Sequence, residues 1–132
     1  MTRLLALVSL CLLLVLPFAP ARAELKVRVD QGGVQKMPIA ISPFHAAQPG
    51  LEEIANGIPE IITSNLERTG LFEPLNPRSF IQDPASIEQQ GPRFPEWRAI
   101  NTQALVTGTA TRTSDGRTRV EFRLWDVFTQ QQ

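Results

Sequence analysis

The chain has 132 residues, and its 13 basic and 13 acidic side chains balance to a formal net charge of zero. A chain of this length accommodates one small domain with a modest core. The balanced charge excludes the basic footprint that is typical of nucleic-acid-binding proteins. The single cysteine, Cys11, excludes a disulfide within the chain.

The first 23 residues have the pattern of an export leader. An apolar run extends from Leu4 to Leu16, and small residues stand at Ala21 and Ala23, the positions that a signal peptidase reads. A membrane anchor is the alternative, but a spanning helix needs roughly 20 apolar residues, which is longer than this run. A lipoprotein signal at Cys11 is disfavoured because the apolar run continues beyond it. We therefore predict a Sec signal peptide over residues 1–23, cleaved after Ala23.

A strand is predicted directly behind the cleavage site. We call this segment the N-terminal arm; its residues are Glu24, Leu25, Lys26, Val27, Arg28, Val29 and Asp30. Its apolar and charged side chains alternate with a period of two, so they occupy opposite faces of the strand. Residues 31–33 include two glycines and predict a flexible joint. Such a strand either pairs within its own domain, which the pattern alone favours, or adds to the sheet of a partner.

A short strand and one strong helix are predicted next. Residues 38–43 carry apolar side chains in succession, as in a strand that is covered on both faces. Residues 51–69 repeat apolar side chains at helical spacing, and Gly70 suits the position after the helix end. Pro59 is expected to lie on the polar face and to kink this helix, or to make it restart near Ile58.

The second half of the chain predicts short elements and then a hairpin. Residues 71–75 predict an extended segment, and the four prolines in residues 76–95 indicate mainly loop. Pro95 suits the start of a helix that contains Trp97. Two strands are predicted over residues 104–113 and 119–127, with a turn at residues 114–116.

This order of elements predicts the fold class. Helices between strands indicate an α/β or α+β domain over residues 34–132, a small mixed sheet with helices packed on it. Because the chain reaches residues 129–132 directly after a well-patterned strand, we expect the domain to be incomplete at its C-terminus.

Few side chains suggest catalysis or metal binding. His45 is the single histidine, and Ser42 and Glu52 are its potential partners. Nucleophilic catalysis needs a base that a third group orients, and a metal site needs several convergent ligands. A polar loop histidine is therefore the favoured interpretation of His45, and a solvated first helical turn is that of Glu52 and Glu53. We predict no enzyme activity, no cofactor and no metal site.

The last strand shows a two-faced pattern. Val120, Phe122 and Leu124 share one face, and Arg119, Glu121 and Arg123 share the other. A solvated outer face is favoured over a basic binding strip because acidic residues are interleaved with the arginines. Trp97 and Trp125 are interpreted as core or rim aromatics.

Several of these segments together resemble a known family. The leader followed by residues 24–30, together with residues 38–44, 61–75, 104–108 and 122–127, is similar to the N-terminal domain of the TolB family. The resemblance covers essentially the whole chain behind the leader, in the right order.

The resemblance implies a function and partners. TolB proteins are periplasmic components of the Tol–Pal system, which supports outer-membrane integrity during cell division. Their N-terminal strand, which corresponds to Glu24–Asp30 here, engages TolA. Their C-terminal six-bladed β-propeller binds the lipoprotein Pal. We find no propeller repeats in this sequence and expect the last strand and helix of the small domain to be missing. A stand-alone exported adaptor or ligand-binding domain, with the arm docked in its own sheet, is the alternative; the missing catalytic side chains disfavour an envelope hydrolase.

Overall fold

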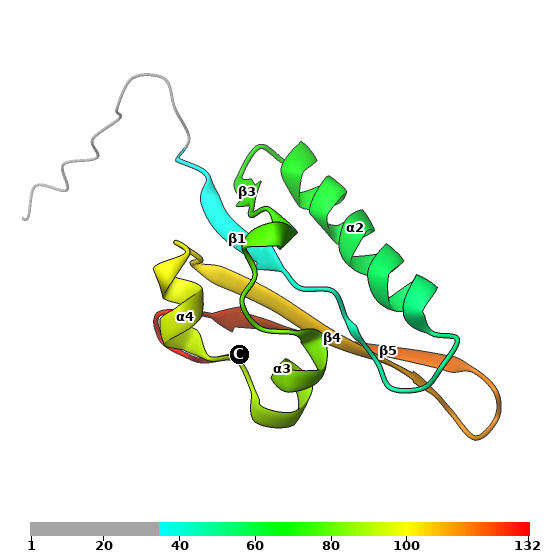
Figure 1. Cartoon of the computed structure of the whole chain (residues 1–132). Coiled ribbons are helices and arrows are strands. Elements are labelled where there is room, and N and C mark those ends of the chain that lie inside the picture. Colours follow the sequence, from blue (N-terminus) through cyan, green and yellow to red (C-terminus); the bar gives the residue numbers. More distant parts are fainter. Residues whose placement is uncertain (1–34) are drawn as a thin grey trace, which may run out of the picture. The chain divides into compact units, whose positions relative to one another are not determined.

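The structure is a computed structural model that describes residues 35–132 (Figure 1). The predicted leader and the N-terminal arm lie outside the described residues. The elements in chain order are β1 (Met37–Ile41), β2 (His45–Ala46), α2 (Glu52–Arg68), β3 (Phe72–Pro74), the 3-10 turn η1 (Pro77–Ser79), α3 (Pro84–Gln90), α4 (Phe94–Ala99), β4 (Ala104–Arg112) and β5 (Thr118–Asp126). The predicted mixed sheet with helices packed on it is confirmed.

Strand β4 organises a five-stranded sheet. It pairs in parallel with β1 and with the two-residue β2, and in antiparallel fashion with β5 along its whole length. Because β5 occupies one edge of β4, β1 and β2 share the other edge. Strand β3 extends the sheet beyond β1, again in parallel. Strand β1 therefore lies inside the sheet, and β3 and β5 are its outer strands.

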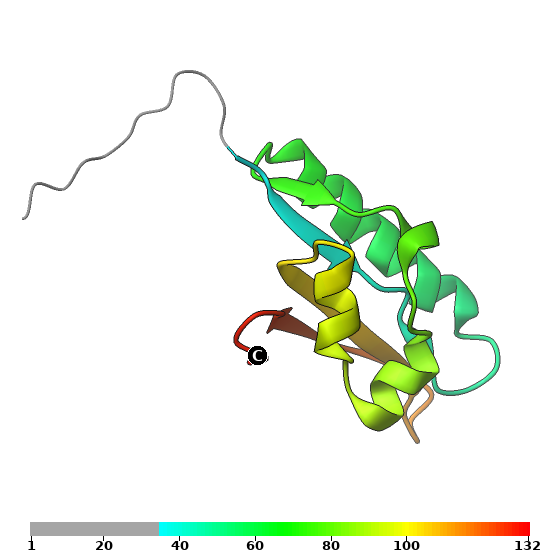
Figure 2. The same cartoon turned by 60° about the vertical axis from the view of Figure 1, so that its left-hand side comes forward.

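The sheet separates two apolar clusters, because helices cover both of its faces (Figure 2). Helix α2 packs on one face, where Ile39, Ile41 and Ala55 belong to one buried cluster. Helices α3 and α4 pack on the opposite face, where Ala40 and Trp97 belong to the other. The central strand β1 contributes to both clusters, so the prediction of a strand covered on both faces is confirmed.

Helix α2 runs as one helix from Glu52 to Arg68, past Pro59, so the predicted restart near Ile58 is wrong. Pro59 is also buried rather than on a polar face. A proline in a helix leaves the carbonyl four residues earlier without its usual donor. Here that carbonyl, on Ala55, accepts a hydrogen bond of 2.9 Å from the amide of Phe44. The bond that the helix loses is thus replaced by a bond from the segment that leads out of β1.

The proline-rich segment is more regular than predicted. Residues 76–95, for which the sequence predicts mainly loop, contain η1 and α3. The Asn76 side chain accepts from the amide of Arg78, and the Asp83 side chain accepts from the amide of Ser86. In both elements a proline stands in the first turn, where it has no bond to lose. The prolines therefore begin helical turns here instead of excluding them.

The remaining elements follow the predictions with small shifts. Residues 71–75 contain β3, the helix expected after Pro95 is α4, and the hairpin strands begin or end within one residue of their predicted bounds. Gly70 and Gly116 have φ values of 72° and 84°, as expected after a helix end and in a tight turn. The predicted loop position of His45 is wrong, because this residue lies in β2 opposite Thr109.

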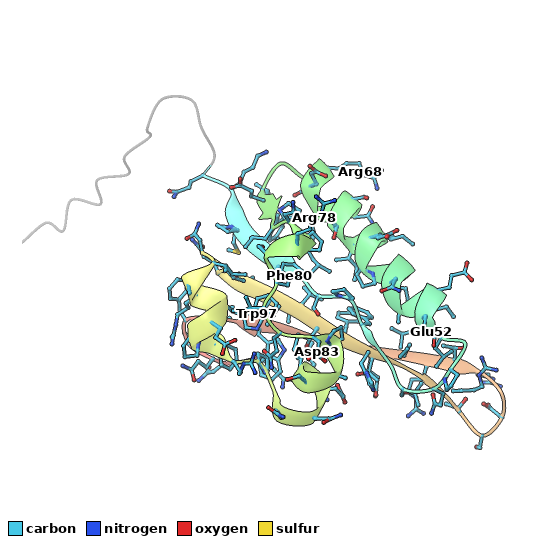
Figure 3. The ribbon with its side chains drawn as sticks, viewed as in Figure 1. Glu52, Arg68, Arg78, Phe80, Asp83 and Trp97 are labelled. Atoms are coloured by element: carbon cyan, nitrogen blue, oxygen red, sulfur yellow. The ribbon has the colours of Figure 1, made fainter. Side chains whose placement is uncertain are left out.

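The face covered by α3 and α4 is held by aromatic packing and one buried amide. Trp97 is fully buried, and the Phe80 ring meets it edge-on at a centroid distance of 5.3 Å (Figure 3). The buried Gln82 side chain accepts from Trp97 Nε1 at 3.1 Å and from the Arg93 amide at 2.9 Å, and donates to the Gly91 carbonyl at 2.9 Å. This side chain ties the loop before α3 to α4.

Candidate interaction surface

The first described strand, β1, lies in the interior of the sheet. Strand β1 begins at Met37, whose amide donates to the Leu71 carbonyl at 2.9 Å. The predicted site residues Glu24–Asp30, and the predicted cleavage residues Ala21 and Ala23, lie outside the described residues. Strand β1, the element that follows the arm in the sequence, pairs with β3 on one edge and with β4 on the other. We call the start of β1 the attachment point of the arm.

An apolar groove begins beside this attachment point. We call it the α2–β5 groove; it has a volume of about 560 Å³. Its lining residues come from five elements, and they are Met37, Ile39, Ile58, Ile62, Leu66, Phe72, Ala104, Val106, Val120, Phe122 and Leu124. The lining contains only apolar side chains, so the groove suits a hydrophobic contact rather than a charged ligand.

The groove exists because α2 does not extend over β5. The main packing partners of α2 in the sheet are β3, β2, β4 and β1. The apolar face of β5 therefore remains largely open: Phe122 and Leu124 are 67% and 55% exposed. Exposed apolar patches of this kind commonly mark interaction sites. The sequence predicts the alternation along β5, but it gives no signal that α2 would leave this face uncovered.

The outer edge of β5, on the side away from β4, ends in a turn that curls back on the strand. The Asp126 carboxylate accepts hydrogen bonds from the amides of Phe128 and Thr129, at 2.8 and 2.9 Å. The Thr129 bond first, and the Phe128 bond after it, hold the pKa of Asp126 below its ordinary value. The Asp126 amide in turn donates to the Gln131 carbonyl at 2.8 Å. Gln131 thereby pairs with the outer edge of β5.

Ser42 and Glu52, the potential partners of His45, make their side-chain hydrogen bonds elsewhere. Ser42 Oγ donates to the Pro43 carbonyl, and the Glu52 carboxylate accepts from the Gly50 amide, so both groups are engaged away from His45. Within residues 35–132, no group of three or more metal-ligating side chains comes together. None of the helices in that part of the chain is long and apolar enough to cross a membrane.

The arginines of β5 lie among acidic groups. Arg123 approaches the Glu88 carboxylate to 3.8 Å, and the same carboxylate accepts from Thr109 Oγ1 at 2.7 Å. This agrees with a solvated, charge-balanced face. Trp125 is half-buried and donates through Nε1 to Thr107 Oγ1 at 3.0 Å, as a rim aromatic does.

Comparison with known proteins identifies the family of this fold. The family profile described as the TolB amino-terminal domain matches residues 25–132. The chain belongs to this family. The match begins within the N-terminal arm and extends through β5, so it includes both the arm and the α2–β5 groove of this TolB-type domain.

Individual relatives agree with the family. The chain is 44% identical over 131 residues to the Tol-Pal system protein TolB of Paramagnetospirillum magneticum, covering 97% of this chain and 29% of that protein. It thus spans under a third of the length of that relative. A crystal structure of TolB from Acinetobacter baumannii is 28% identical, with a TM-score of 0.47 over 74% of this chain and 21% of that chain.

A more distant structure shares the fold alone. The C-terminal domain of LpoB from Salmonella enterica has a TM-score of 0.53 at 12% identity, and the likeness covers 77% of this chain and 79% of that domain. The same arrangement of sheet and helices therefore occurs in a second bacterial protein with little sequence in common.

Proposed function

We propose that this chain is a non-enzymatic interaction protein of the Tol–Pal envelope system, acting in the periplasm and supporting outer-membrane integrity and cell division. In this proposal the N-terminal arm, Glu24–Asp30, engages TolA. The observation that carries the proposal is the family match over residues 25–132, which includes nearly all of the arm. The 44% identity to a Tol-Pal system protein supports it.

The attachment of the arm suits binding by strand addition. In that mode the backbone of a peptide supplies hydrogen bonds to a sheet edge, and alternate side chains supply specificity. Leu25, Val27 and Val29 would provide the apolar face. Strand β1, which follows the arm in the sequence, is paired on both edges and so is not itself a free strand.

Deletion of residues 24–30 tests the proposal. We expect the shortened protein to keep its circular dichroism spectrum and to lose binding to the periplasmic part of TolA in calorimetric titration. Val27→Pro should have a similar effect, because proline cannot donate a backbone hydrogen bond. Val27→Thr keeps the donor and the strand preference, and it serves as the matched control. Unchanged TolA affinity after the deletion would refute the assignment.

Export to the periplasm is a separate part of the proposal. We expect the protein recovered from the periplasmic fraction to begin at Glu24, because a signal peptidase would cut after Ala23. N-terminal sequencing measures this directly. Replacing both Ala21 and Ala23 by Arg should block the cut and leave the precursor in the membrane fraction. A precursor processed normally despite both changes would place the cleavage site elsewhere.

A separate expectation concerns the binding of Pal. The resemblance assigns Pal binding to the propeller of longer family members, and this chain spans only 29% of the relative from P. magneticum. We therefore expect residues 24–132 to bind TolA without Pal. A titration with Pal in place of TolA checks this expectation, and strong binding would place a Pal contact in the small domain.

A stand-alone adaptor or ligand-binding domain is the second candidate. The observation that favours it is the open α2–β5 groove, whose rim includes Met37, the first residue of β1. In this case the arm would be docked in its own sheet. Hydrogen exchange separates the two candidates: protected amides at Leu25, Val27 and Val29 without TolA favour a docked arm, and rapid exchange favours an arm that is free to bind.

A further inference from the structure

Another groove lies where the outer strand β3 ends. We call it the α2–η1 groove; it has a volume of about 510 Å³. Its lining residues come from the end of β1, from α2 and from η1, and they are Ile41, Pro43, Asn56, Pro59, Glu60, Thr63, Ser64 and Pro77. None of these residues lines the α2–β5 groove, so the two grooves are separate.

The α2–η1 groove has a place in the sheet where ligands commonly bind. Strands β1 and β3 are parallel neighbours, and the groove lies at their carboxyl ends. The chain that leaves β1 leads to α2 on one face of the sheet, and the chain that leaves β3 leads to α3 and α4 on the other face (Figure 2). In open α/β sheets, connections that diverge in this way leave a ligand-binding crevice at the carboxyl ends of the two strands.

Backbone groups of Ile41 face the end of β3. The Ile39 carbonyl accepts from the Leu75 amide at 2.9 Å, and alternate residues of a strand direct their backbone groups to the same side. In this register the next donor, for the Ile41 carbonyl, would be Pro77, which has no N–H. Within residues 35–132, neither the amide nor the carbonyl of Ile41 has a hydrogen-bond partner, although this residue is only 4% exposed. A segment that pairs with both groups therefore removes an unfavourable contribution to the free energy.

The wall that α2 contributes is polar and acidic. Asn56, Glu60 and Ser64 follow one another at intervals of four residues, so they form a row along one side of the helix. Glu60 is the charged member of the lining and is exposed. In the described part of the chain its carboxylate takes part in no ion pair. The carboxylate of Glu60 favours a bound segment that carries a basic side chain.

We propose that the α2–η1 groove binds a short extended segment of a partner protein, which pairs with the backbone of Ile41 and places a basic side chain beside Glu60. The segment continues the sheet past the end of β3, in the mode of strand addition. Because Pro43 has no N–H, the backbone pairing is confined to Ile41, and the row of side chains along α2 supplies the specificity.

NMR titration of the isotopically labelled protein, expressed from its complete sequence, tests this proposal. The probes are the peptides acetyl-Val-Lys-Val-amide and acetyl-Val-Glu-Val-amide, which carry opposite charges on the middle side chain. We expect the lysine peptide to shift the amide signals of Ile41, Asn56 and Glu60 in a saturable manner and to slow hydrogen exchange at the Ile41 amide. The glutamate peptide should bind about fivefold more weakly. Methylation of the backbone nitrogens of the lysine peptide should also weaken its binding, because the Ile41 carbonyl then has no donor.

A matched pair of variants separates the groove from a general effect of charge. Glu60→Gln should weaken binding of the lysine peptide about fivefold. Glu67→Gln removes the same charge from an exposed position of the same helix outside the groove, and it should leave binding unchanged. Equal binding of the two peptides, signal shifts centred away from the groove, or the absence of saturable binding would each overturn the proposal. An Ile41 amide that is protected without peptide and becomes exposed after deletion of residues 24–30 would overturn it in favour of the N-terminal arm as the occupant.

Discussion

Removal of the buried Gln82 amide should be among the most damaging single changes in this domain. Gln82 is 5% exposed and holds three partners from the segment that leads into and through α4. Replacement by Met keeps the length and apolar stem of the side chain but removes both polar atoms. Trp97 Nε1 then loses its acceptor inside a fully buried residue, and the Arg93 amide and Gly91 carbonyl lose their bonds as well.

The expected magnitude follows from these three bonds. Each buried polar group left without a partner costs about 1–3 kcal/mol. Trp97 bears this cost in full because it is completely buried, whereas Gly91 is only partly buried and Arg93 is exposed, so water can replace part of their bonds. We therefore expect Gln82→Met to lower the free energy of unfolding by about 2–4 kcal/mol. For a domain of this size that corresponds to a Tm decrease of roughly 10–25 °C.

Thermal and urea unfolding, followed by circular dichroism and tryptophan fluorescence, measure this effect. Gln89→Met is the matched control, because Gln89 lies exposed on the adjoining helix α3. Gln82→Glu keeps the acceptor for Trp97 and Arg93 but brings a buried carboxylate oxygen against the Gly91 carbonyl, so at neutral pH it should destabilise the domain at least as much as Gln82→Met. If Gln82→Met and Gln89→Met shift the Tm equally, the reasoning from the buried amide is refuted.

Substitutions at four further positions test other parts of the fold. Gly108→Ala should destabilise the domain by about 1–3 kcal/mol in urea unfolding, because the new Cβ would lie 2.8 Å from the Phe44 ring. Gly57→Ala should stabilise the domain by about 0.5–1 kcal/mol, since the position is helical and has open space around it. A Gly108→Ala variant more stable than the Gly57→Ala variant would contradict the packing described. Asp83→Ala should cost about 1 kcal/mol by removing the cap of α3, and Asp83→Asn should recover most of it. Hydrogen bonds lower the pKa of Asp126 in the folded state. The ionised carboxylate should therefore stabilise the fold above its unfolded pKa of about 3.9, and this stabilisation should be lost as the pH falls through the lower folded pKa. The urea midpoints of the wild type and Asp126→Ala should therefore converge below about pH 4. A difference between the two midpoints that stays constant with pH would show that ionisation of this carboxylate does not stabilise the fold.

The elements that the sequence predicts well are those with a strong local pattern. The helical repeat of α2, the run of apolar residues in β1 and the β4–β5 hairpin all lie close to their predicted bounds. In each, the local period and the turn residues agree with the tertiary structure. The family resemblance rests on the same segments and is confirmed by the match over residues 25–132.

Other features depend on contacts between distant residues. Whether Pro59 breaks α2 is decided by the Phe44 amide, which reaches the carbonyl of Ala55 from outside the helix. The helical turns of η1 and α3, by contrast, carry a local signal that the prediction missed, because Asn76 and Asp83 stand as caps directly before Pro77 and Pro84. A proline inside a helix leaves one carbonyl without its helical donor, and the local sequence of α2 does not show that the Phe44 amide supplies another donor.

The candidate interaction surface also has one feature that the sequence predicts and one that it does not. The alternation of the arm and of β5 is a property of the sequence, since side chains in a strand alternate between its two faces. Whether a given face becomes core or groove depends on which helix packs over it. Helix α2 packs over β1 and its neighbours, and Phe122 and Leu124 remain exposed as a result. The sequence thus determined that β5 has an apolar face, and only the tertiary structure decided that this face is open, because burial is set by packing between elements rather than by the pattern within one.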